Sequence, residues 1–286
     1  MNIQFLGTGA AEGIPALFCQ CPLCRKAEAA GGREIRTRCG ALVNNRILID
    51  LTPDIFLHKL RFGLDLSAVE GVVVTHSHSD HFDGAELTKR CTSHYCRIEG
   101  ERPFKVYGNG TVCGLGRESL RLEFGAGENP SVTFEEVKPY DTWEFGGVRF
   151  SAVPACHDPG ETCLIYVLED KESRVLYAND TGMLTQEAFD FLEGKVFDMV
   201  SLDCTFGAGK APVPGHMGME ENRLFLDELK WRGCLGEETV VYATHFSHNC
   251  GMTHRELEEM GKAWGVRIAW DGMRWGKAVP GDSCAG

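Results

Sequence analysis

Short apolar runs in which side chains alternate between hydrophobic and polar recur along the chain and predict a protein rich in β-strands. Glycine, proline, asparagine and aspartate bound these runs, as they commonly do at turns. Asn44-Asn45 is expected to be the turn of a hairpin over residues 41–50. The predicted strands cover residues 3–6, 47–49, 71–74, 105–107, 132–137, 143–145, 148–153, 162–168, 174–178, 199–202 and 240–243.

Four other segments are predicted to be helical: residues 53–62, 82–90, 220–230 and 253–264. The last begins with Thr253 and Glu256, whose spacing is that of a capping box. Because strands and helices follow one another without a linker, residues 1–280 are expected to form one domain and 281–286 a disordered tail. Periodicity alone predicts a mixed α and β protein. Two sheets packed face to face with helices outside fit this order of elements.

Composition and charge narrow the class of protein. The chain has 286 residues, of which 43% are hydrophobic and 24% charged, so it can bury a full core. Its net charge of -12 argues against nucleic acid as a partner, because phosphate backbones are bound mainly through lysine and arginine. No apolar run is long enough to span a membrane, and the amino end lacks the pattern of a signal peptide. We therefore expect a cytoplasmic protein, and the sequence leaves a homodimer open.

The densest group of potential metal ligands follows the predicted strand at 71–74. His76, His78, Asp80 and His81 stand within six positions. Because side chains alternate in an extended segment, His76 and His78 share a face and can hold one ion, while the other two lie past a bend and can reach a second. A lone histidine here would be interpreted as a capping or core residue. Four ligands at these intervals favour a two-metal hydrolase site.

Further candidate ligands come directly after predicted strands. His157, Asp180 and His245 each follow one, and another strand ends at Asp203. A carboxylate beyond a buried strand can bridge two ions because it has two oxygens to share. Asp50 belongs to the same layer, where the cap of a helix is one interpretation.

A cluster of cysteines near the amino end predicts a second kind of site. Cys19, Cys21 and Cys24 have the spacing Cys-x-Cys-x-x-Cys, which can wrap one zinc ion and needs one more ligand. The simpler alternative is that the three cysteines are small buried core residues. A redox dithiol is another alternative, but it would use only two of the three thiols. We favour a structural metal. The remaining cysteines are scattered and are expected to be small core residues: Cys39, Cys91, Cys96, Cys113, Cys156, Cys163, Cys204, Cys234, Cys250 and Cys284.

Some histidines carry no metal motif of their own. His58 is expected on the surface of the helix at 53–62, and His94 in an exposed loop. The irregular stretch around His94, which ends at Pro103, is expected to lie over the site. His216 stands in a loop rich in glycine and proline, where an exposed position is the plain interpretation.

The pattern His-x-His-x-Asp-His resembles that of the metallo-β-lactamase superfamily. The openings Gly7-Thr8-Gly9 and Gly13-Ile14-Pro15 are similar to those of a branch that includes ribonuclease Z and cyclic-phosphate phosphodiesterases. This resemblance implies an α/β (α+β) fold, the four-layer αββα sandwich. It also implies one ion held by His76, His78 and His157, a second held by Asp80, His81 and His245, and a bridge between them formed by Asp180. For Asp50 the resemblance implies, instead of a helix cap, that it orients a metal-binding histidine or the following turn.

Within that superfamily the chain most resembles the phosphodiesterases of phosphonate breakdown that open 5-phosphoribosyl 1,2-cyclic phosphate. The resemblance implies that His248 completes the structural zinc site with Cys19, Cys21 and Cys24, and that His216 assists catalysis. His216 and Asp80 are thus the expected catalytic residues. Two divalent ions, zinc, manganese or iron, would generate hydroxide near neutral pH and neutralise charge on the phosphoryl group. The expected substrate is a small-molecule phosphodiester, although glycines in the loop at Gly207 and Gly209 depart from the family pattern and put its selectivity in doubt.

Two other relatives define the alternatives. Ribonuclease Z, a tRNA 3′ endonuclease, shares most of the ligands, but only twenty-two residues separate His157 from Asp180, too few for the long insert that grips tRNA in such enzymes. A non-catalytic carrier role, as in the relative from pyrroloquinoline quinone biosynthesis, would tolerate loss of ligands, yet all seven are present here. Flavodiiron oxygen reductases would need an attached flavodoxin domain, for which the chain has no room.

Overall fold

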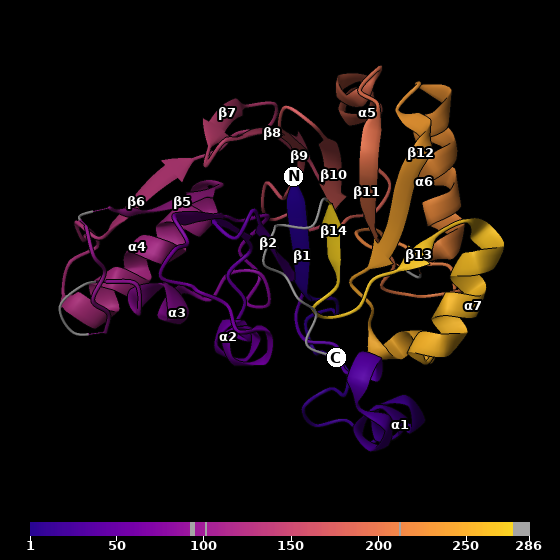
Figure 1. The fold of residues 1–286 in the computed structure, drawn as a ribbon, viewed down its shortest axis with the longest axis horizontal. Coiled ribbons are helices and arrows are strands. Elements are labelled where there is room, and N and C mark those ends of the chain that lie inside the picture. Colours follow the sequence, from indigo (N-terminus) through magenta and orange to yellow (C-terminus); the bar gives the residue numbers. More distant parts are fainter. Residues whose placement is uncertain (92–94, 101, 212, 277–286) are drawn as a thin grey trace.

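The computed structural model describes residues 1–91, 95–100, 102–211 and 213–276. Two seven-stranded sheets face each other and helices cover both outer sides, as Figure 1 shows. The first sheet has the order β14-β1-β2-β3-β4-β5-β6, antiparallel from β14 to β3 and parallel from β3 to β6. Its strands are β1 (Asn2–Gly7), β2 (Gly40–Val43), β3 (Ile47–Ile49), β4 (Gly71–Val73), β5 (Phe104–Gly108), β6 (Val132–Glu136) and β14 (Arg274–Gly276).

The second sheet repeats this plan in the carboxyl half of the chain. Its order is β13-β12-β11-β10-β9-β8-β7, antiparallel from β7 to β10 and parallel from β10 to β13. Its strands are β7 (Thr142–Phe145), β8 (Val148–Pro154), β9 (Leu164–Glu169), β10 (Arg174–Ala178), β11 (Phe197–Asp203), β12 (Leu235–Thr244) and β13 (Arg267–Ile268).

Helices form the outer layers. Helices α2, α3 and α4 cover the first sheet, and α5, α6 and α7 cover the second (Figure 1). The helices are α1 (Pro22–Ala30), α2 (Ile55–Phe62), α3 (Gly84–Thr88), α4 (Gly110–Phe124), α5 (Gln186–Leu192), α6 (Met219–Trp231) and α7 (His254–Trp264). None of the described helices is both long and apolar enough to cross a membrane.

The central strands of both sheets are buried on both faces, and alternate residues enter different cores. On β3, Ile47 and Ile49 join the core between the sheets, whereas Leu48 packs under the outer helices. On β10, Tyr177 faces the central core and Leu176 the helices of the other layer. Because alternate residues of a strand face opposite sides, each short strand contacts both the other sheet and the outer helices. The strands thus form the two inner layers of a four-layer fold. The expected αββα architecture is confirmed.

The structure also contains helices that the sequence did not predict, namely α1, α4 and α5. Directly after the strand predicted at 105–107 the chain enters α4, where the side chain of Asn109 accepts from the N–H of Val112. Glycines within α4 concealed it, since glycine disfavours helices. Gly116 is needed there because a Cβ would come within 2.3 Å of the Phe134 ring on β6. The helix expected at 82–90 is shorter, ending at Thr88.

The expectation that His58 lies on the surface is wrong, and several other expectations concern residues outside the described part of the chain. His58 is buried, with 1% of its surface exposed, because Thr37 packs over it and their Nε2 and Oγ1 atoms lie 2.7 Å apart. The described residues 95–100 of the segment expected over the site contact the outer helices. Tyr95 packs on Phe124 of α4, and the thiol of Cys96 donates to the carbonyl of Arg90. His94, Cys284 and the tail at 281–286 lie outside the described residues, and the single-domain expectation stays a prediction.

Candidate metal centres

The loop after β4, residues 75–81, is held in place by two carboxylates, one buried and one partly buried. Asp50, at the end of β3, accepts from the Thr75 N–H at 2.8 Å and lies 2.7 Å from His81 Nδ1. Glu161 accepts from the Ser77 N–H at 2.9 Å. Of the two roles open for Asp50, the structure therefore shows the orienting one, since α2 has Asp54 at its N-cap position.

Two groups of four residues meet at this loop, and the ligand atoms within each group lie within 4.8 Å of one another. Asp180, directly after β10, belongs to both. The first group is His76, His78, His157 and Asp180, and the second is Asp80, His81, Asp180 and His245. The structure thus brings together all seven residues that the resemblance assigned to two ions, with Asp180 in the shared position.

Three ring nitrogens in these groups lie close together and lack hydrogen-bond partners. The Nε2 atoms of His76, His81 and His245 are buried and have no hydrogen-bond partner. They nevertheless converge on one oxygen, Asp180 Oδ2, at 3.4, 3.1 and 3.5 Å. A buried polar atom without a hydrogen-bond partner costs free energy. A cluster of such atoms therefore indicates a binding site. Imidazole and carboxylate together suit divalent metal ions, and the residues fit them.

The buried negative charge in this region also indicates bound metal ions. Asp50, Asp80, Asp180 and Asp203 are all buried, with 6% of the surface or less exposed. Burial raises the pKa of Asp180, but His245 and His216 outweigh it and hold this pKa well below its usual value. Burial lowers the pKa of His81, yet the neighbouring Asp80 and Asp50 hold it well above its usual value. Buried carboxylates in such number require positive charge nearby, which ions would supply.

Three residues at the ends of strands adopt left-handed backbone conformations that non-glycine residues seldom occupy. Asp50, Asp180 and His245 have φ of 63°, 61° and 59°. Such conformations cost free energy and persist where the surrounding structure holds them, often at functional sites. All three residues belong to the candidate centre. The turns therefore bring their side chains into the layer between the strand ends.

His216 lies beside the dinuclear group. Its Nδ1 lies 3.0 Å from Asp180 Oδ1 and 3.2 Å from Asp203 Oδ2, and 24% of its side chain is exposed. The preceding residue, Gly215, has φ of 105°, and a Cβ there would come within 3.0 Å of the His157 carbonyl oxygen. Glycine therefore lets the loop pass close to His157 and place His216 at the centre.

The cysteine cluster forms a separate site. The Sγ atoms of Cys19, Cys21 and Cys24 lie 3.3, 3.6 and 3.6 Å from His248 Nδ1. A tetrahedral zinc ion with ordinary bond lengths separates a sulfur and a nitrogen ligand by about 3.5 Å. The hydrogen bond from the Cys24 backbone N–H to Cys21 Sγ lowers the pKa of that thiol, which favours the thiolate that metals bind. These four residues fit a closed structural zinc site.

Some neighbours of the ligands were not predicted as site residues. Asp203 is fully buried and accepts from the Met217 N–H at 2.7 Å, beside His216. Asp158 lies 3.1 Å from His78 Nε2. Asp203 carried a signal in the sequence, because it follows a predicted strand like the other ligands. Asp158 and Glu161 carried none, since both stand in a loop between strands.

A model of the β-lactamase superfamily domain matches residues 45–246 of the chain. The coenzyme PQQ synthesis protein B of Azoarcus sp. (strain BH72) is 23% identical, over 96% of this chain and 99% of that protein. The octanoyltransferase of Porphyromonas gingivalis (strain ATCC BAA-308 / W83) is 30% identical over 146 residues, which are 49% of this chain. That match spans only 27% of the octanoyltransferase.

Solved structures share the fold over nearly the whole chain. A diphosphatase from the PhnP family has a TM-score of 0.73 and 23% identity, covering 97% of this chain and 98% of its own. The Zn²⁺-bound PqqB from Methylobacterium extorquens has a TM-score of 0.73 and 19% identity, covering 97% and 100%. The short form of human tRNase Z has a TM-score of 0.68 and 15% identity, covering 98% and 100%. At these identities the likeness concerns the fold alone.

Proposed function

Because the chain belongs to the metallo-β-lactamase superfamily, we propose that it is a metal-dependent phosphodiesterase that opens a small cyclic phosphodiester, such as 5-phosphoribosyl 1,2-cyclic phosphate. The observation that carries the proposal is the position of Asp180. This carboxylate belongs to both four-residue groups at the loop and to a third group, with Asp203, His216 and His245. Such an arrangement suits two ions and one proton donor around a single reacting phosphoryl group.

The residues divide into two sets around Asp180. His76, His78 and His157 would hold one ion and Asp80, His81 and His245 the other. Two bound divalent ions supply a nucleophilic hydroxide near neutral pH and stabilise negative charge on the phosphoryl oxygens. The cysteine site would hold a third ion with a structural role. Zinc, manganese and iron all suit the dinuclear residues.

The protein itself supplies orientation and a proton. Asp50 fixes the ring of His81 through Nδ1, which leaves Nε2 facing Asp180. His216 is held through Nδ1, which leaves its Nε2 as the atom able to reach a substrate. From that position it would protonate the departing ribosyl oxygen or bind the phosphate. A positioned general acid contributes roughly a hundredfold or more to the rate.

The names of similar proteins support a hydrolase function for this chain, but those proteins act on different substrates. The PhnP-family structure is named a diphosphatase, and the human structure a tRNase Z. Two observations argue against a tRNA substrate. The net charge is -12, and the connection between His157 and Asp180 is short and contains only β9 and β10. The complete ligand set argues against a non-catalytic carrier role. A cytoplasmic location and a homodimer remain expectations.

A comparison of substrates tests the proposal. We would measure kcat/KM of the metal-loaded protein on 5-phosphoribosyl 1,2-cyclic phosphate, 2′,3′-cyclic AMP, a small diphosphate ester and precursor tRNA. The ribosyl cyclic phosphate is expected to be cleaved fastest, and the cyclic nucleotide more slowly. Faster cleavage of precursor tRNA would favour ribonuclease Z, and faster cleavage of the diphosphate would favour a diphosphatase. Absence of hydrolysis in every assay would favour a carrier.

A further inference from the structure

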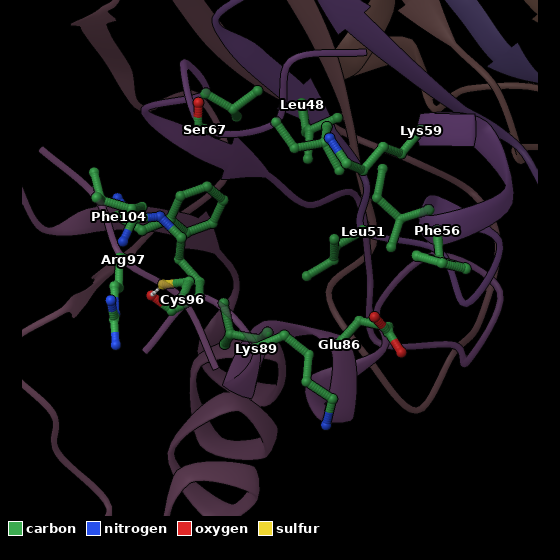
Figure 2. A pocket seen from close by; sticks show the side chains of 16 residues that line it. Leu48, Leu51, Phe56, Lys59, Ser67, Glu86, Lys89, Cys96, Arg97 and Phe104 are labelled. Carbon is green, nitrogen blue, oxygen red and sulfur yellow. Dashed lines mark hydrogen bonds between the residues drawn. The ribbon is translucent and has the colours of Figure 1, made fainter. Parts of the chain in front are cut away.

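A cavity of about 340 Å³ lies between the outer face of the first sheet and helices α2 and α3. Figure 2 shows Leu48, Leu51 and Phe104 around this space, with Lys59 at its rim. None of the residues that line it is a candidate metal ligand. The cavity is therefore separate from both candidate metal centres and has no part in the proposed function.

The walls of the cavity are apolar. Its volume is at the lower end of the range of small-molecule sites, so the space suits one slender ligand. Water in an apolar cavity finds few hydrogen-bond partners, whereas an alkyl chain gains by leaving water. The following lining residues are each at least nine-tenths buried: Leu48, Leu51, Ile55, Val69, Leu87 and Phe104.

The charged residues around the cavity are mostly positive. Lys59, Lys89, Arg90 and Arg97 line it, against a single carboxylate, Glu86. This excess of positive charge occurs in a chain whose net charge is -12. Within the described residues, none of the four cations has a carboxylate at ion-pair distance. The cavity thus combines apolar walls with cations that no carboxylate among the described residues neutralises.

Arg90 is the cation best placed to bind an anion. Its Nε is buried and has no hydrogen-bond partner. Its guanidinium lies 5.5 Å from the centre of the Phe104 ring, and so next to the apolar wall. Another nitrogen of the guanidinium, Nη2, donates to the Arg102 carbonyl at 3.3 Å. A buried unpaired donor is costly, and a carboxylate would satisfy it with a charge-assisted hydrogen bond.

We propose that this cavity binds one medium-chain fatty carboxylate, with its alkyl chain against Leu87 and Phe104 and its carboxylate at Arg90. The cavity length limits the chain, since a chain that is too long must leave its end in water. Affinity is expected to rise about fourfold for each CH₂ group until the cavity is filled. Loss of the charged hydrogen bond is expected to weaken binding roughly tenfold or more.

Calorimetric titration of the whole protein with hexanoate, decanoate and tetradecanoate tests this proposal. Because all three ligands carry the same carboxylate, binding through the carboxylate alone, for example at a metal centre, would not strengthen with chain length. Decanoate is expected to bind at one site, more tightly than hexanoate. Arg90→Gln should weaken it roughly tenfold, and Leu66→Trp, at a partly buried lining residue, should block it. Arg117→Gln is the matched control, because Arg117 also lies over an aromatic ring, that of Phe134, outside the cavity.

Each other outcome would overturn the proposal. Absence of saturable binding by folded wild-type protein would exclude a fatty-acid site. Binding unchanged in both Arg90→Gln and Leu66→Trp would place the ligand elsewhere. Equal affinity for decanoate and the uncharged 1-decanol, or an effect of Leu66→Trp alone, would show an apolar pocket that does not select anions. Circular dichroism of each variant verifies folding, and Arg90→Lys provides a second variant that retains the charge.

Discussion

Asp203 lies between His216 and His245, and its Oδ2 is 3.2 Å from the Nδ1 atom of each. One buried carboxylate thus orients both a proposed metal ligand and the proposed proton donor. Its other oxygen accepts from the N–H groups of Thr205 and Met217 at 3.0 and 2.7 Å. These bonds anchor the loop that carries His216 to the end of β11.

Replacement of Asp203 by asparagine is therefore expected to lower kcat by about ten- to a hundredfold, the range found when partners of metal ligands are removed. The KM should change less, because the side chain does not face the substrate. Steady-state kinetics on the cleaved substrate, with metal content determined in parallel, measures this. Asp158→Asn is the control, because Asp158 orients only His78 and is more than a third exposed. Equal kcat in both variants would contradict the role of Asp203.

His216→Ala is expected to reduce kcat roughly a hundredfold while leaving the metal content unchanged, because His216 is not in either group of the proposed dinuclear site. Kinetic assays and elemental analysis of the same preparations test this. A variant as active as the wild type would remove His216 from the mechanism and leave the metal site intact. Loss of an ion from the variant would instead identify His216 as a ligand.

Protein prepared without a chelator is expected to hold three metal ions, two labile and one tightly bound. Cys21→Ser should remove the tight zinc, because a four-ligand site loses one thiolate. Elemental analysis before and after dialysis measures the stoichiometry. Cys96→Ser, at a half-buried thiol outside the cluster, should leave it unchanged. A stoichiometry of two or fewer that Cys21→Ser does not alter would exclude the structural site.

Replacing each of the two histidines after β12, His245 and His248, is expected to affect activity and stability differently. His248→Ala is expected to lower the Tm more than kcat, because a closed zinc site is coupled to folding. His245→Ala should lower kcat more than the Tm, because the dinuclear ions act on the substrate. Thermal unfolding and kinetics of both variants provide the comparison. Equal loss of activity with unchanged Tm in both would show that His248 has been assigned to the wrong site.

His58 should make the fold sensitive to acid. Burial lowers the pKa of His58 to about 4, below the usual value of 6.5. The unfolded chain then binds a proton in this interval that the folded chain does not, so stability falls as the pH drops from about 6.5 to about 4. Between about pH 7 and pH 5 the loss from this residue is about 2 kcal/mol.

Urea unfolding of chelator-treated wild type and His58→Gln at these two pH values tests this. The variant, which lacks the titrating group, should lose less stability on acidification, even if it is less stable at neutral pH. Chelation removes the contribution of metal release at low pH from both proteins. Equal slopes would show that His58 is protonated in the folded state, or that the folded protein opens locally around it.

The sequence was sufficient where the relevant contacts are local. His76, His78, Asp80 and His81 stand within one short loop, so their spacing predicted the position of the site before any packing was known. Most strands, though not the short strands β13 and β14, were likewise predicted, because burial on two faces appears as alternation between consecutive residues. The capping box of α7 was predicted for the same reason, and its Glu256 accepts from the Thr253 N–H at 2.8 Å.

Contacts between distant segments needed the tertiary structure. Asp203 meets a histidine 42 positions away, and Ser77 meets Glu161 84 positions away. The burial of His58 by Thr37 and the accommodation of Gly116 beside Phe134 likewise depend on neighbouring elements. Residue spacing along the chain encodes which face a side chain takes within its own strand or helix. Which carboxylate faces which histidine is decided only when two sheets and their loops pack together, because hydrogen bonds act over about 3 Å and no local pattern records that approach.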